Sequence, residues 1–228
     1  MKTVREIIAE VVNFVLNLIL PADSEMNDVR NMKESEVFKK LQKVSEQKYS
    51  DMFAIFSYKD KLVRKMIWQM KFRECYWVAE VFGKFLACGV LKLISKENYV
   101  EEIFLVPIPL HHKRYAERGY NQCEWLCNEI LRNILRMRVE GVKVMPKIIY
   151  NKNTLKRTKY RTKQSWSSRA DRFKNSENIF AVSDDSPVFG RKFILIDDVV
   201  TTGATLNEAR RTLLASGASA VICFVIAH

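Results

Sequence analysis

The stretch "FILIDDVVTTGATL", residues 193–206, decides the fold that we expect for this chain. It begins with a short apolar run, continues with Asp197 and Asp198, and then passes through a threonine- and glycine-rich turn into a helical pattern. A second apolar run, "AVICFVIA" at 220–227, follows that helix. Strand, acidic loop, helix and strand in this order predict a βαβ unit. The loop of such a unit opens at the carboxyl edge of a parallel sheet, where ligands usually bind.

The start of the helix in this unit is the expected ligand site. Thr205 is followed three positions later by Glu208, which predicts a capping box, and Gly217 is placed to end the helix. Free N–H groups and partial positive charge at a helix N-terminus suit a phosphate, and Gly203 permits close backbone approach. The two aspartates would repel a phosphate, so they are expected to serve hydroxyl groups or a metal ion beside it. The loop therefore predicts a ligand with a phosphate at one end and a diol or Mg²⁺ at the other.

The rest of the chain alternates strand and helix patterns. This alternation predicts an α/β fold with a mainly parallel sheet flanked by helices. Strands are expected at 51–58, 103–110, 147–150 and 179–182, and helices at 60–72, 76–94 and 122–138. The residues "HHKRYAERGYNQ", which follow the second of these strands, are expected to form a basic loop.

The charge of the chain favours polyanionic partners. A net charge of +12 over 228 residues is typical of proteins that bind nucleic acid, phosphorylated metabolites or an anionic membrane surface. Much of it lies in residues 147–174, where ten Lys or Arg residues accompany one acid, Asp171. The five cysteines form no CxxC pair, so we expect free thiols in a reducing cytoplasm.

The N-terminal stretch 1–20 is apolar but interrupted by Glu and Asn at helical spacing. Its uncharged part is shorter than the roughly 20 residues of a membrane span. We therefore expect no transmembrane segment and an amphipathic helix packed on the protein, with a membrane-surface or partner-binding helix as the alternative.

The acidic stretch resembles the phosphoribosyl pyrophosphate (PRPP) motif of type I phosphoribosyltransferases along its whole length. Further segments are similar to the ComF/GntX branch of competence proteins: "YKDKLVRKMIWQMKF" at 58–72, "VPIPLHHKRYAERGYNQ" at 106–122 and "RTKYRTKQSWSSRADRFKNSENIFAV" at 157–182. The resemblance covers residues 50–228. It implies the type I phosphoribosyltransferase fold.

The resemblance also implies roles for single residues. Asp197 and Asp198 would contact the ribose hydroxyls and the Mg²⁺ of PRPP. The 5′-phosphate would lie in the loop formed by Thr201, Thr202, Gly203, Ala204 and Thr205. The side chains implied to contact the leaving pyrophosphate or DNA are Lys71, Lys113, Arg114, Arg118, Gln164 and Arg172.

The implied activity is transfer of a phosphoribosyl group with release of pyrophosphate, in a cytoplasmic protein linked to DNA uptake. Members of the branch act alongside a competence helicase and recombination proteins, which are the implied partners. No acceptor motif is readable. A non-catalytic adaptor for single-stranded DNA or protein, or a regulator whose DNA affinity is set by PRPP, therefore remains as an alternative. The segment 151–175 would either close over the site or grip DNA, with Tyr160 and Trp166 as stacking groups.

The N-terminal part departs from the family pattern. Members of the branch usually carry a zinc ribbon with two CxxC pairs, but residues 1–74 contain neither cysteine nor histidine, so we predict no zinc site. We expect a helical N-terminal region and connector over residues 1–50, in the place of the zinc ribbon. A phosphoribosyltransferase-like domain is expected over 51–228.

Overall fold

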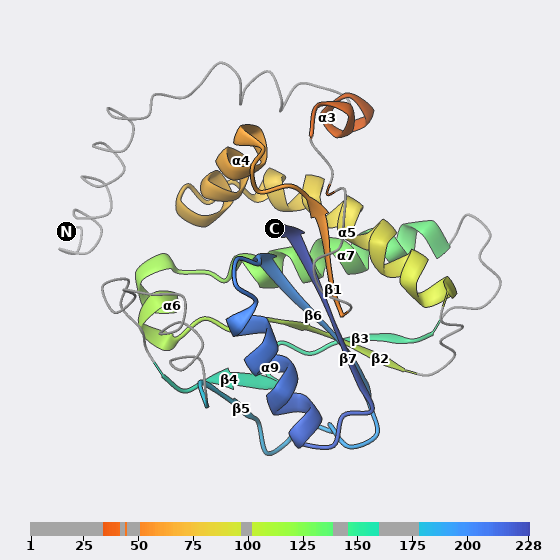
Figure 1. Ribbon diagram of the computed structural model, residues 1–228, viewed down its shortest axis with the longest axis vertical. Coiled ribbons are helices and arrows are strands. Elements are labelled where there is room, and N and C mark those ends of the chain that lie inside the picture. Colours follow the sequence, from red (N-terminus) through yellow and green to blue (C-terminus); the bar gives the residue numbers. More distant parts are fainter. Residues whose placement is uncertain (1–33, 42–43, 45–50, 97–101, 139–145, 160–177) are drawn as a thin grey trace, which may run out of the picture.

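The computed structural model describes most of the chain beyond the N-terminal region (Figure 1). The described residues are 34–41, 44, 51–96, 102–138, 146–159 and 178–228. The expected N-terminal helix at 1–20 and most of the basic segment, including Tyr160 and Trp166, lie outside them. In the described part of the chain, no helix is long and apolar enough to cross a membrane.

A five-stranded parallel sheet forms the centre of the protein, as the alternating pattern predicts. Its strands are β1 (Met52–Phe56), β2 (Ile103–Pro107), β3 (Ile148–Tyr150), β6 (Lys192–Val199) and β7 (Ala220–Ala227). They follow the order β1-β7-β6-β2-β3, and every neighbouring pair is parallel. The acidic stretch is therefore in the central strand, with Ile196 opposite Phe224 of β7 and Pro107 of β2.

Two hydrophobic cores cover the two faces of this sheet. The first core contains α4 (Lys61–Phe72), α5 (Tyr76–Lys96), α7 (Gln122–Arg138) and part of α3 (Glu34–Lys40). The second core contains α9 (Ala204–Ala215) and a separate pair of antiparallel strands, β4 (Leu155–Arg157) and β5 (Phe180–Val182). Ile194 and Ile196 of β6 pack in the first core, and Phe193 and Leu195 pack in the second. Burial on both faces explains why the strand is an unbroken apolar run.

Two predicted elements are wrong in detail. Strand 179–182 was expected in the main sheet, but β5 pairs only with β4 in a small sheet on the α9 side. The expected basic loop is a short helix, α6 (His112–Arg118). His111 caps α6 by accepting a hydrogen bond from the Lys113 N–H at 3.3 Å, and Gly119 ends it with φ of 83°. Such a left-handed C-cap favours glycine.

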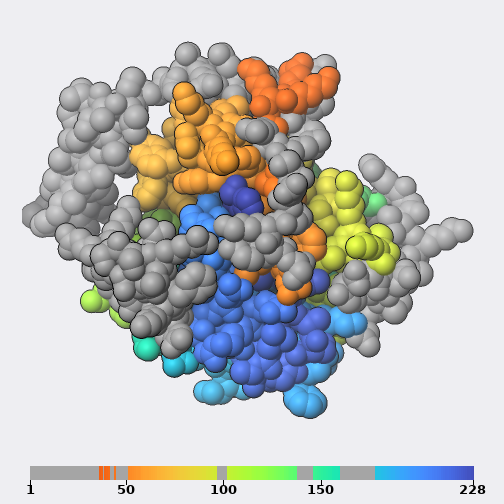
Figure 2. Space-filling view, in the orientation of Figure 1, coloured from red at the N-terminus to blue at the C-terminus, as the bar shows by residue number. Residues whose placement is uncertain are grey.

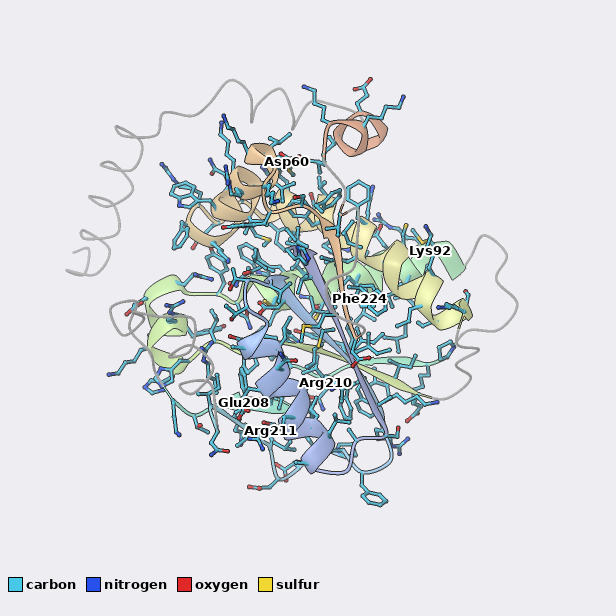
Figure 3. The ribbon with its side chains drawn as sticks, viewed as in Figure 1. Asp60, Lys92, Glu208, Arg210, Arg211 and Phe224 are labelled. Atoms are coloured by element: carbon cyan, nitrogen blue, oxygen red, sulfur yellow. The ribbon has the colours of Figure 1, made fainter. Side chains whose placement is uncertain are left out.

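The start of α9 also differs from the prediction. Its N-cap is Gly203, with φ of 77° and no side-chain cap, so the expected capping box does not form. Glu208 instead accepts hydrogen bonds from the Arg211 side chain at 2.8 Å and from the backbone N–H of Asn178 at 2.5 Å (Figure 3). Gly217 ends the helix as predicted, with φ of 91°.

Candidate functional site

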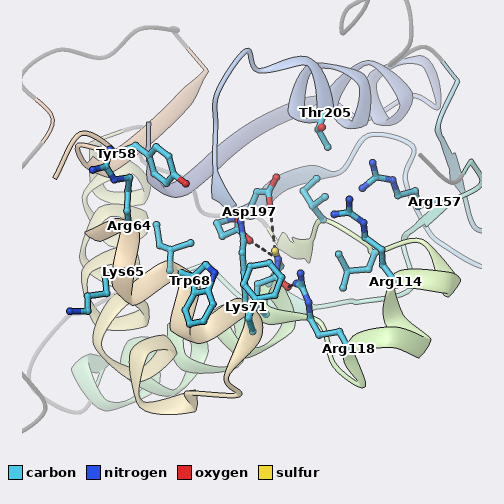
Figure 4. Close-up of a pocket in the computed structure, with 17 residues that line it drawn as sticks. Tyr58, Arg64, Lys65, Trp68, Lys71, Arg114, Arg118, Arg157, Asp197 and Thr205 are labelled. Atoms are coloured by element: carbon cyan, nitrogen blue, oxygen red, sulfur yellow. Dashed lines mark hydrogen bonds and ion pairs between the residues drawn. The ribbon is translucent and has the colours of Figure 1, made fainter. Parts of the chain in front are cut away.

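The acidic pair lies at the carboxyl end of the central strand. β6 continues to Val199, so Asp197 and Asp198 belong to the strand rather than to the loop after it. Asp198 is buried and Asp197 is half-buried. The Asp198 N–H donates to Asp197 Oδ1 at 2.9 Å. Both residues line a cavity of about 610 Å³ (Figure 4).

The carboxylate of Asp198 has a partner on each oxygen. Lys71 Nζ, from α4, lies 2.7 Å from Oδ1, and Gln122 Nε2, from α7, donates to Oδ2 at 2.5 Å. Arg118 of α6 donates in turn to Gln122 Oε1. Burial is the largest single influence on the pKa of Lys71 and lowers it, but the charge and hydrogen bond of Asp198, together with the charge of Asp197, outweigh burial, and the pKa is raised. Two helices that are distant in sequence, α4 and α7, are therefore tied directly to one carboxylate, and α6 is tied to it through Gln122.

The sequence "RGYNQ" at 118–122 explains how α7 reaches the acidic pair. Asn121 donates to the Ile108 carbonyl at 3.1 Å and accepts from the Cys123 N–H at 3.0 Å, so it caps α7 and fixes it to the end of β2. Tyr120 donates its hydroxyl to the Met70 carbonyl at 2.8 Å, next to Lys71. Gln122 is consequently the first residue of α7 and points at Asp198.

Asp197 is held in a less polar surrounding. Its Oδ1 accepts from the Cys123 thiol at 3.4 Å. Burial, together with the charge of Asp198, raises the pKa of Asp197 to about 7. Burial also raises the pKa of Cys123 well above its ordinary value, so Cys123 acts as a neutral donor.

This raised pKa predicts a pH dependence of folding in metal-free buffer. The folded state binds the Asp197 proton more tightly than the unfolded chain, so this carboxyl lowers the free energy of unfolding as pH rises from about 4 to about 7. Asp197→Asn should remove that slope. Relative to wild type, the variant should gain up to about 1 kcal/mol per pH unit in urea unfolding. Asp184→Asn, at an exposed position, should follow the wild-type curve, and parallel curves for wild type and Asp197→Asn would contradict the prediction.

The remaining walls of the cavity are strongly basic. The cationic side chains among the lining residues are Arg64, Lys65, Lys71, Arg114, Arg118 and Arg157. In Figure 4, Arg114, Arg157 and Thr205 lie on one side of Asp197, and Tyr58, Arg64 and Trp68 lie on the other. α4 forms the second side, and on the face in Figure 2 its orange side chains lie directly above the blue C-terminal residues. An anionic ligand is the charge complement of this cavity.

The structure brings together a subset of the predicted site residues. Those that line the cavity are Lys71, Arg114, Arg118, Asp197, Asp198 and Thr205. Lys113 lies on α6 but is not among the lining residues, and Gln164 and Arg172 lie outside the described residues.

The first turn of α9 adjoins the cavity through Thr205, directly after the loop that follows β6. Thr201 is exposed, and Ala204 N–H donates to Thr202 Oγ1 at 3.4 Å within the loop. With Gly203 in the left-handed conformation, the chain turns directly from the acidic strand into α9. A phosphate-binding role for Thr201, Thr202, Gly203, Ala204 and Thr205 stays a prediction.

Several lining residues were not predicted to belong to the site, namely Tyr58, Arg64, Lys65, Trp68, Phe72, Gln122, Cys123 and Arg157. Helical periodicity was the available signal on α4, because Arg64, Trp68 and Phe72 lie opposite the buried Val63 and Met66. No comparable signal marks Arg157, which lines the cavity from the end of β4.

A metal ion would find few ligand atoms here. Cys123, Asp197 and Asp198 offer ligand atoms within 4.8 Å of one another. Both oxygens of Asp198 already accept from Lys71 and Gln122, and Cys123 is protonated. Mg²⁺ prefers oxygen ligands and keeps several waters. Asp197 therefore fits as one ligand, with the others supplied by water and by a bound phosphate compound.

Comparisons with known proteins agree with this architecture. Residues 141–228 match the phosphoribosyl transferase domain. The chain is 30% identical over 149 residues to competence protein F of Haemophilus influenzae, covering 65% of this chain and 60% of the relative. It is 30% identical over 156 residues to DNA utilization protein YhgH of Escherichia coli K12, covering 68% of this chain and 63% of the relative.

A solved hypoxanthine phosphoribosyltransferase from Trypanosoma cruzi matches with a TM-score of 0.41 and 11% identity, over 64% of this chain and 65% of that one. The matched domain and the parallel sheet, with its acidic pair at the carboxyl edge, define a protein with the type I phosphoribosyltransferase fold. The chain belongs to the ComF family of competence proteins. It spans somewhat less than two thirds of the length of the two curated relatives described above.

Proposed function

We propose that this protein binds PRPP with Mg²⁺ in the cavity beside β6 and transfers its phosphoribosyl group to an acceptor. The observation that carries the proposal is the placement of Asp197 and Asp198. They are the acidic residues of a cavity whose other charged lining residues are all basic, and they shortly precede the turn into α9. A ligand that joins phosphates to a vicinal diol satisfies both features, because carboxylates accept from hydroxyls and cations pair with phosphates.

Each part of the ligand has a matching part of the site. The ribose hydroxyls would donate to the acidic pair, and the 5′-phosphate would accept from N–H groups at the start of α9. Arg114, Arg118 and Arg157 line the cavity and would neutralise the pyrophosphate. Mg²⁺, when bound, supplies further positive charge for the leaving group, and Asp197 would hold it together with the ligand.

The proposed reaction is a substitution at the anomeric carbon of PRPP. The bond from this carbon to the pyrophosphate oxygen breaks, and its electron pair leaves with pyrophosphate. The acceptor forms the new bond and releases its proton to solvent. The chain contributes by positioning the reactants and stabilising developing charge, since the cavity is built of fixed cations and carboxylates.

We further propose a link to DNA uptake or use. The supporting observation is the family itself, whose members include one named a competence protein and one named a DNA utilization protein. The partners that the family resemblance implies, a competence helicase and recombination proteins, belong to this part of the proposal, as does the expected cytoplasmic location. A non-catalytic adaptor on the same fold is the second candidate, and the absence of pyrophosphate release with every acceptor tested would favour it.

Calorimetric titration of the protein with PRPP, with and without Mg²⁺, tests the proposal. We expect saturable binding that strengthens when Mg²⁺ is present. Ribose 5-phosphate should bind more weakly, because it lacks the pyrophosphate that Arg114, Arg118 and Arg157 would contact. No binding of PRPP by the folded protein would overturn the proposal.

A further inference from the structure

The α4 side of the cavity carries a row of residues that PRPP binding does not require. Arg64, Trp68 and Phe72 recur at i, i+4 and i+8, so they lie along one line of the helix. All three line the cavity, together with Tyr58 just before α4. We call these four residues the α4 face. In Figure 4 its labelled members lie across Asp197 from Arg114, Arg157 and Thr205.

Two of the three aromatic side chains of the α4 face are exposed to solvent, and Trp68 is half-buried. Phe72 is 44% exposed and Tyr58 is 36% exposed, although both are large and apolar. The Trp68 and Phe72 rings lie with centroids 5.6 Å apart. The guanidinium group of Arg73 lies 5.5 Å from the Trp68 ring, and that of Arg118 lies 5.4 Å from the Phe72 ring. Large exposed apolar groups that line a cationic cavity indicate a ligand that is both planar and anionic.

A nucleotide has this combination of properties. Bases stack on aromatic side chains whatever their sequence, and the phosphate pairs with Lys or Arg. Arg64 and Trp68 are one helical turn apart, about 6 Å along the axis, so a base on Trp68 leaves its phosphate within reach of Arg64. We infer that the α4 face binds a nucleotide unit, with the base on the rings of Trp68 and Phe72 and the phosphate on Arg64.

This inference goes beyond the proposed function and does not need it, because the α4 face and the acidic pair are separate groups of residues. The nucleotide unit has two sources with the same chemistry. It is either a free nucleotide or an unpaired residue of single-stranded DNA. Binding measurements with both kinds of probe distinguish the sources.

The test compares a labelled oligothymidylate with an abasic deoxyribose-phosphate strand of the same length, by fluorescence anisotropy. For the double variant Trp68→Ala/Phe72→Ala we expect about tenfold weaker binding of the oligothymidylate. The abasic strand should bind wild type and variant equally and more weakly than the oligothymidylate binds wild type. If thymidine monophosphate displaces the oligothymidylate from wild type, and is about tenfold less effective with the variant, the natural ligand is a free nucleotide. If the oligothymidylate binds and thymidine monophosphate does not displace it, the natural ligand is single-stranded DNA.

Three further variants keep the inference falsifiable. Phe189→Ala removes an aromatic ring that is 87% exposed and does not line the cavity, and it should leave binding unchanged. Trp68→Phe keeps a ring and should retain most of the affinity. Arg64→Gln should reduce the salt dependence of oligothymidylate binding by about one phosphate contact.

Two results would overturn the inference: equal oligothymidylate binding by wild type and the folded Trp68→Ala/Phe72→Ala variant, or equal binding of abasic strand and oligothymidylate by wild type. PRPP titration of the single variant Trp68→Ala separates this outcome from the proposed function, because the Trp68 ring lies against Arg73 and not against Arg118, so its removal should leave the affinity for PRPP unchanged. A wild type that binds oligothymidylate through Trp68 but binds no PRPP would overturn only the proposed function.

Discussion

The double substitution Asp197→Asn/Asp198→Asn is expected to weaken the binding of PRPP and Mg²⁺ at least about 100-fold in calorimetry. Hydrogen bonds to a charged acceptor contribute about 1.5–3 kcal/mol each, and two such acceptors would be lost. Inorganic pyrophosphate, titrated without Mg²⁺, should respond in the opposite way. It has no hydroxyls for the acidic pair, and removing two negative charges from a basic cavity should leave its affinity unchanged or increase it.

The chain offers a matched control for this change. Asp184 and Asp185 are also adjacent aspartates, but they are exposed and do not line the cavity. The variant Asp184→Asn/Asp185→Asn has the same net charge as the test variant and should bind PRPP like wild type. If both variants bind PRPP equally weakly, the change in net charge alone would explain the loss of affinity. An unchanged affinity in the Asp197/Asp198 variant would remove these residues from the site.

The central part of the fold is predictable because its signals are local. In residues 193–227, apolar runs and a helical period alternate, and these short-range patterns are enough to predict β6, α9 and β7. β7 lies at 220–227, as predicted. Predicted helix 122–138 likewise agrees with α7. The predicted capping box does not form because the N-cap of α9 is Gly203, two residues before Thr205, the residue that was expected to cap it. Gly203 adopts a left-handed conformation that starts the helix before Thr205, and Arg211 pairs with Glu208.

The candidate site was predictable only where a motif marks it. Asp197 and Asp198 follow from the motif, whereas the partners of Asp198 come from α4 and α7, which only the tertiary fold brings together. The α4 face is a similar case. A sequence pattern with one polar side predicts only that the helix lies at the surface. That Trp68 and Phe72 border a site follows from their position in the cavity, which the tertiary structure forms. β5 was assigned to the wrong sheet because three residues carry no information about their pairing partner.

Removal of Lys71 should destabilise the protein even without any ligand. Asp198 has a side chain that is 6% exposed, and Lys71 provides its ion pair at 2.7 Å. Lys71→Met keeps most of the side-chain length but leaves a buried carboxylate whose remaining side-chain donor, among the described residues, would be Gln122. Breaking a buried ion pair costs about 3–5 kcal/mol. Because the Lys71 side chain is itself 25% exposed, we expect a loss near the lower end, about 3 kcal/mol, in urea unfolding at neutral pH.

A double-mutant cycle decides whether this loss comes from the ion pair. Asp198→Asn removes the charge that Lys71→Met would leave unpaired, so the double variant should recover about 2 kcal/mol relative to the sum of the single losses. Lys61→Met, at an exposed position of the same helix, should change stability by less than about 0.5 kcal/mol. Additive losses in the cycle would mean that Lys71 stabilises the fold by packing alone. A positive coupling would establish that α4, which carries the proposed nucleotide surface, is anchored to the central strand through the acidic pair.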